Sequence, residues 1–111
     1  MTTESREFSG SLRERIRIER LDSVRDALGS TSQTRELVGE YWAAALANGT
    51  GPETAGESRS AMQQWRFILR HTREILPGDY LLWRGRHMMI SAVDTEYRPV
   101  AKTILLAEET R

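Results

Sequence analysis

The chain contains no cysteine, and this absence removes several kinds of chemistry at once. Without thiols there is no disulfide framework, no thiolate zinc site and no cysteine nucleophile. The two histidines, His71 and His87, are too far apart for the helical spacing of a metal site. We therefore expect both histidines to be structural or surface residues, and we expect no metal and no other cofactor.

Long apolar runs are also absent. No run approaches the roughly 18 residues that a membrane-spanning helix needs, and the first ten residues lack the basic-then-apolar order of a signal peptide. The sequence therefore predicts a soluble protein that is made inside the cell and has no membrane partner.

An excess charge of either sign is missing as well, because 16 basic and 16 acidic residues cancel. A dedicated DNA-binding domain is usually basic, so the composition disfavours that class. All the basic residues except Lys102 are arginines, which suit bidentate contacts between subunits.

The residues that remain do not form a recognisable catalytic set. The Gly-x-Gly pair at residues 49–51 lacks the strand-to-helix context of a phosphate loop. Glu108 and Glu109 are adjacent, so on a strand they point to opposite faces and cannot act as a paired acid and base. Asp79 and Asp94 lie in turn-like segments, where aspartate commonly caps its own backbone. We expect no enzymatic activity.

A chain of 111 residues with 39% apolar content can build one modest core. A domain of this size buries only around two-thirds of its unfolded surface, so partner subunits can supply part of its stability. The length thus favours a single domain that works as an oligomer.

Two interpretations compete for residues 12–28. Leu12, Ile16 and Leu21 begin an approximate helical stripe, whereas residues 14–20 alternate charged side chains with Ile16 and Ile18 as a half-buried strand does. Periodicity alone slightly favours the helix, and from the residues by themselves both remain open.

Further along, the pattern predicts strands joined by short turns. The clearest is residues 62–72, where Trp65, Phe67 and Leu69 alternate with mostly polar side chains. The other predicted elements are a strand over 33–47, a turn at 76–79, a hairpin of strands 80–83 and 87–93 around Arg84 and Gly85, a turn over 94–99 and a closing strand over 100–107. Short connections without crossover helices favour a mainly β fold, a small antiparallel barrel or sandwich of about five to six strands.

One long loop, residues 47–60, interrupts this layout. It contains no apolar side chain larger than alanine and is long for a compact domain, which indicates a functional or disordered segment. Thr50 and Glu53 have capping-box spacing, so the loop could contain a short helix. The candidate functional residues are Asn48, Gly49, Thr50, Gly51, Pro52, Glu53, Thr54, Ala55, Gly56, Glu57, Ser58 and Arg59.

The larger side chains have a simple structural explanation. Aromatic residues can stack nucleic-acid bases, but at strand spacing among aliphatic neighbours most of them should be core. Met88 and Met89 likewise fit core and edge better than a soft-metal site. The aromatic residues concerned are Trp42, Trp65, Phe67, Tyr80 and Trp83.

Four blocks together resemble a known family in order and spacing: LRERIRIER, EYWAAA, WRFILR, and PGDYLLWRGRHMMISAV followed by TILLAEE. The resemblance is to the phage head-tail joining family, the head-closure or stopper proteins of long-tailed phages, prophages and gene transfer particles. It extends over residues 12–109.

The resemblance implies a β-barrel domain over residues 11–111, a flexible segment over 1–10, and a strand over 14–20. It implies a ring, commonly of six copies, in the neck of a particle assembled in the host cytoplasm. The partners would be a portal-adaptor ring, a tail terminator or tail tube, and packaged double-stranded DNA that passes without sequence recognition. Residues 47–60 match the family's long loop, which would reach the channel or contact an adjoining ring.

The near-neutral charge suits such a conduit, because strong phosphate neutralisation would make DNA bind tightly. The alternatives are another ring component, namely an adaptor, a tail terminator or a baseplate subunit, or a small barrel that binds single-stranded nucleic acid. An adaptor should be more helical, and a nucleic-acid barrel should bind oligonucleotides in a salt-dependent way.

Overall fold

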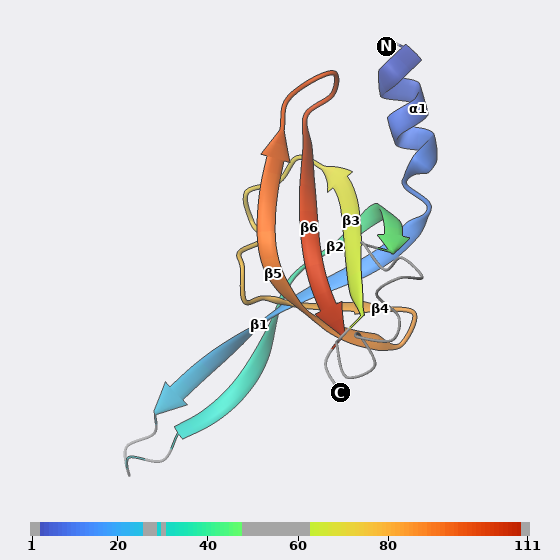
Figure 1. The fold of residues 1–111 in the computed structure, drawn as a ribbon. Helices are drawn as coiled ribbons and strands as arrows, with labels where there is room; N and C mark the ends of the chain where they lie inside the picture. Colours follow the sequence, from blue (N-terminus) through green and yellow to red (C-terminus); the bar gives the residue numbers. More distant parts are fainter. Residues whose placement is uncertain (1–2, 26–28, 30, 48–62, 110–111) are drawn as a thin grey trace.

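The computed structural model describes residues 3–25, 29, 31–47 and 63–109, and Figure 1 shows their arrangement. One short helix precedes six strands. The elements are α1 (Thr3–Ser11), β1 (Glu14–Arg25), β2 (Thr31–Ala47), β3 (Gln64–Arg70), β4 (Tyr80–Trp83), β5 (Arg86–Glu96) and β6 (Lys102–Glu109).

The six strands form a closed barrel in the order β1-β2-β3-β6-β5-β4, and every neighbouring pair is antiparallel. The mainly β prediction is therefore confirmed. Of the two interpretations left open for residues 12–28, helix and strand, the structure has the strand, β1. Ile16 and Ile18 are fully buried while Arg15 is exposed, which is the alternation of a strand with one face on the core.

The core fills the barrel with inward side chains from all six strands. Phe67 on β3 is fully buried and meets the Trp83 ring edge-on, with ring centroids 5.4 Å apart. The fully buried core residues besides Phe67 include Ile16, Ile18, Ala43, Leu81, Met88, Ile90, Leu105 and Ala107.

The hairpin between β4 and β5 follows the prediction from the sequence. Arg84 and Gly85 both have positive φ, 49° and 77°. Two successive residues with positive φ are typical of the type I′ turn that joins twisted antiparallel strands. Gly85 occupies such a conformation without the steric cost that a Cβ would add.

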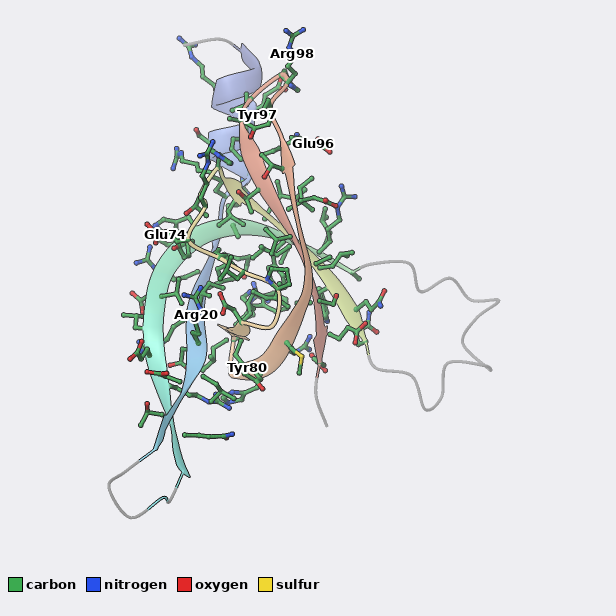
Figure 2. The ribbon with its side chains drawn as sticks, turned by 90° about the vertical axis from the view of Figure 1, so that its left-hand side faces the viewer. Arg20, Glu74, Tyr80, Glu96, Tyr97 and Arg98 are labelled. Atoms are coloured by element: carbon green, nitrogen blue, oxygen red, sulfur yellow. The ribbon has the colours of Figure 1, made fainter. Side chains whose placement is uncertain are left out.

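The first two strands extend well beyond the barrel. β1 pairs with β4 only at residues 17–19, and β2 pairs with β3 only at residues 43–47. Residues 20–25 therefore pair only with residues 31–36. Together with Leu37 and Val38 they form a projecting two-stranded ribbon, residues 20–25 and 31–38, which we call the arm (Figures 1 and 2). The predicted limits at residues 20 and 33 were too short, because the arm strands satisfy each other's backbone hydrogen bonds without a core beneath them.

A β-bulge lies where the arm leaves the barrel. Ile18 pairs with Gly39, whereas Glu19 already pairs with Leu37, so Val38 is the extra residue. Such a bulge bends a strand and increases its twist, which accounts for the change of direction at this point.

At the amino terminus, helix α1 is an element that the sequence did not indicate. Buried Leu12 follows the helix, and Arg70 on β3 donates to the Ser9 hydroxyl at 3.0 Å. The assignment of residues 1–10 as flexible and of residues 11–111 as one domain stays a prediction.

Candidate interaction surfaces

The base of the arm is fastened to the loop between β3 and β4 by a bidentate ion pair. The guanidinium of Arg20 donates to both carboxylate oxygens of Asp79, at 2.8 and 2.9 Å, and to the Glu74 backbone carbonyl at 2.9 Å. Asp79 is 3% exposed and also accepts from the backbone N–H of Leu76 at 2.9 Å. The hydrogen bond to Asp79 raises the pKa of Arg20. This cluster, which we call the clamp, holds the arm at its junction with the barrel, and Figure 2 shows Arg20 and Glu74 there.

Asp79 therefore has the backbone-capping role that its turn position predicted, and it has a second role that the sequence did not reveal. Its ion pair with Arg20 joins residues 59 positions apart. No local pattern identifies a partner at that separation.

A tyrosine adds a second connection at the same place. Tyr41 on β2 donates its hydroxyl to the Glu74 carboxylate at 2.7 Å. Burial, followed by this hydrogen bond, raises the pKa of Tyr41 to about 12. The ring lies across Gly39, where an added Cβ would be 2.7 Å from the Tyr41 hydroxyl oxygen. Glycine is needed here because the aromatic ring occupies the space of a side chain.

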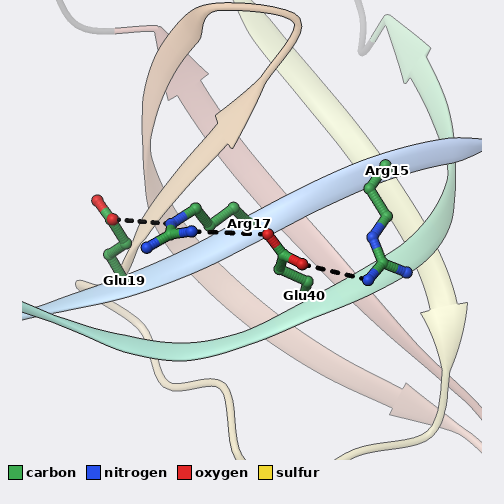
Figure 3. Close-up of polar contacts among 4 residues, drawn as sticks. All are labelled: Arg15, Arg17, Glu19 and Glu40. Carbon is green, nitrogen blue, oxygen red and sulfur yellow. Dashed lines mark hydrogen bonds and ion pairs between the residues drawn. The ribbon is translucent and has the colours of Figure 1, made fainter.

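The outer face of β1 and β2 above the arm carries a chain of exposed ion pairs (Figure 3). Glu40 accepts from Arg15 at 3.3 Å and lies 3.6 Å from Arg17, which in turn contacts Glu19 at 3.0 Å. Pairs of this exposure contribute little to stability, so their main effect is to keep this surface polar.

Trp42 belongs to the same outer face, which corrects one expectation. The prediction that most aromatic residues are core is confirmed for Phe67 and Trp83, but Trp42 is 51% exposed beneath the Arg15 guanidinium, 5.1 Å away. It lies between the inward-facing Tyr41 and Ala43, and alternation along β2 therefore directs it outward.

Two leucines are exposed on the arm itself. Leu21 faces Arg35 across the two strands, and Leu37 faces Glu19, so the leucines are diagonal neighbours on one face. Their exposed fractions are 37% and 53%. Arg35 lies over the Tyr80 ring at 5.0 Å and 3.5 Å from the Glu19 carboxylate.

On the outer face of β3, β6 and β5 there is a depression of about 410 Å³, which we call the β6 depression. Ile104 and Leu106 form its floor, and their cross-strand neighbours include Arg66 on β3 and Asp94 on β5. The depression is lined by Arg66, Asp94, Thr95, Glu96, Ile104 and Leu106.

The two histidines lie on different parts of the fold. His71 is 3.5 Å from the Thr103 hydroxyl and near the Tyr97 ring, while His87 lies on β5. Within the part of the chain that the structure describes, no group of acidic or histidine side chains could hold a metal ion. Among the same residues, no helix has the length and apolar character needed to cross a membrane.

Glu108 and Glu109 are directed to different neighbours, as their adjacent positions predict. Glu108 accepts from Gln64 on β3 at 2.9 Å, and Glu109 pairs with Arg86 on β5 at 3.3 Å. The two methionines also fit their predicted places, because Met88 is fully buried and Met89 is 40% exposed.

The loop that the sequence marked as functional, residues 48–59, lies outside the described residues, and its assignment stays a prediction. Sequence reasoning missed the arm and the β6 depression. The signal for the arm was two mostly polar segments in which the apolar residues are Leu21, Val24, Leu37 and Val38.

The sequence model of the phage head completion protein family matches residues 9–110. The chain belongs to this family. The match includes all six strands, and the resemblance found in the sequence is therefore confirmed. No curated protein matches the chain.

The solved structures with a similar fold include the following two. A protein in the virion of a native gene transfer agent particle is 25% identical with a TM-score of 0.66, and the match spans 89% of this chain and 96% of that one. Protein SF1141 from Shigella flexneri 2a is 23% identical with a TM-score of 0.67, spanning 90% and 94% of the two chains.

Proposed function

We propose that this chain is a head-closure subunit of a phage or phage-like particle, which retains packaged DNA and provides the platform for the tail. The single observation that carries the proposal is the head completion family match over nearly the whole chain. The similarity to a chain in a gene transfer agent virion supports a structural role in a particle, without catalysis.

In this proposal the subunit assembles into a ring in the neck, with six copies as the expected number. The ring lies between a portal-adaptor ring and the tail terminator or tail tube, and DNA passes through its lumen without sequence recognition. Two properties of the chain support this. Its net charge is zero, which disfavours tight phosphate binding, and its barrel is small, so that subunit contacts can add stability.

The test compares particles assembled with and without the chain. We expect particles that lack it to have heads without joined tails and to lose packaged DNA, and a plasmid copy of the gene should restore both properties. Imaging of complemented particles should show a ring of this protein at the portal vertex. Normal tail joining and DNA retention in its absence would contradict the proposal.

The loop over residues 48–59 is proposed to reach the channel or to contact an adjoining ring. Its polar, glycine-containing sequence supports an exposed position. Deletion of residues 49–57 should reduce DNA retention or tail joining. The control replaces the same residues by a glycine-serine segment of equal length, which shows whether the effect comes from the residues of the loop or from its length. If the deletion leaves both properties intact, the loop has neither role.

A further inference from the structure

We propose that the arm of one copy docks through Leu21 and Leu37 onto the β6 depression of the next copy, with Arg35 placed against Asp94. This inference rests on the proposed ring, and it names the two surfaces that join neighbouring subunits. Four observations on the described residues support it.

The first observation is that the arm lacks structural support of its own. A two-stranded ribbon is marginally stable in water, and residues 20–25 and 31–38 pair with no further strand. The clamp nevertheless holds its base through the bidentate contact of Arg20 with Asp79. A projecting ribbon with a fixed base and exposed leucines is expected where a partner covers it.

The second observation is that the β6 depression offers a matching surface. Ile104 is only 7% exposed although it lies on the outward face, and Leu106 beside it is half-buried. Their cross-strand neighbours add Ile68 on β3 and Ala92 on β5. Two exposed leucines from another subunit would therefore meet an apolar floor.

The third observation concerns charge. Asp94 and Arg66 stand on opposite sides of the depression, and neither side chain makes an ion pair or hydrogen bond with another described residue. On the arm, Arg35 lies directly opposite Leu21 and its side chain is 43% exposed. A cation beside the apolar arm residues is complementary to an anion beside the apolar floor whose carboxylate has no partner among the described residues.

The fourth observation is the position of the two surfaces. In the barrel order, β6 is three strands away from β1 in either direction, so the arm and the depression lie on opposite walls. In Figure 2 the arm projects at the lower left, whereas Glu96, which lines the depression, lies near the top of the view. A contact between different patches on opposite walls repeats from copy to copy, and it closes into a ring when the rotation allows.

Because the chain contains no cysteine, cross-linking can test this contact directly. We would prepare particles with the full chain carrying Leu37→Cys and Asp94→Cys together, and treat them with a short bismaleimide. The expected product is a ladder of covalent multimers of this chain, with monomers only from each single variant. The matched control replaces Asp94→Cys by Met89→Cys, an exposed position on the same strand but outside the depression.

The other outcomes are equally decisive. If imaging shows the ring but the Leu37 and Asp94 pair gives no ladder, the docking contact is wrong while the proposed function stands. If Leu37→Cys links to a different virion protein, the arm binds that protein instead and the inference fails. Absence of the chain from the particles would overturn the proposed function itself.

A charge exchange provides a second test. Arg35→Asp and Asp94→Arg should each reduce ring assembly, and the double variant should restore it in part, because the pair is reversed but kept. Arg73→Asp is the control, since it makes the same charge change at an exposed site on the β3–β4 loop. Equal loss in the double variant and the two single variants would contradict the pairing.

Discussion

The clamp provides the sharpest stability test, through the substitution Arg20→Met. The methionine keeps much of the aliphatic stem. It leaves the Asp79 carboxylate, whose side chain is 4% exposed, with the Leu76 N–H as its one remaining donor among the described residues. A buried acceptor that loses its partner costs about 1–3 kcal/mol, and more when it is charged. Because the Arg20 side chain is 40% exposed, water can replace part of the lost contact. We therefore expect a loss of about 2 kcal/mol of unfolding free energy.

The control is Glu40→Gln, which removes the carboxylate from the exposed pairs with Arg15 and Arg17. Surface pairs contribute about 0–1 kcal/mol, so the unfolding free energy of this variant should remain close to that of the parent protein. The unfolding free energy of Arg20→Lys should lie between those of Arg20→Met and Glu40→Gln. The lysine ammonium keeps the charge but cannot make the bidentate contact with Asp79.

The assay is urea unfolding followed by circular dichroism, with free energies obtained by linear extrapolation. A loss of 2 kcal/mol corresponds to a fall in Tm of roughly 8 °C for a chain of this length. Added salt should weaken the effect of Glu40→Gln far more than that of Arg20→Met, because exposed pairs are screened and the Asp79 side is buried. The reasoning is refuted if Arg20→Met destabilises the protein no more than Glu40→Gln.

Three further predictions concern the neighbouring packing. Gly39→Ala should cost about 1–3 kcal/mol, because its Cβ displaces the Tyr41 ring, whereas Gly10→Ala, with no atom within 4 Å of the added Cβ, should cost nothing measurable in urea unfolding. In a pH titration of tyrosinate absorbance, Tyr41→Phe should remove a component near pH 12. Since the pKa of Tyr41 is raised from 10.0, its stabilising contribution is complete below pH 10 and is lost as pH rises toward 12, so stability should fall less steeply there in Tyr41→Phe. Phe67→Ala should cost about 3–5 kcal/mol, because it empties a fully buried site, and an unfolding midpoint near that of the parent would contradict this packing.

The local pattern was a good guide wherever one face of a strand rests on the core. Residues 80–83 were predicted as a strand and are β4, and the predicted hairpin turn is found at Arg84 and Gly85. Alternation in β3 likewise identified Phe67 and Leu69 as buried. In these segments apolar and polar residues alternate with the same two-residue period as the side chains of a strand, so the sequence shows which residues face the core.

Beyond the core, the alternation of apolar and polar residues no longer predicted the strand limits. In the arm no strand face is buried against the core to mark the strand limits, and the backbone hydrogen bonds come from pairing between its own two strands. Trp42 shows a related difficulty, because the hydrophobicity of a residue does not tell which face of its strand it occupies.

The amino-acid sequence by itself determined the mainly β class, the family and the absence of thiol chemistry, because these depend on residue types and their local order. Only the tertiary structure decided that Arg20 meets Asp79, that Leu21 and Leu37 share one exposed face, and that Ile104 forms the floor of an outer depression. Those relations depend on strand register and barrel closure. Register is set by the sum of many side-chain contacts and by bulges, at Val38 in β2 and between Ile90 and Ala92 in β5, which no local period encodes.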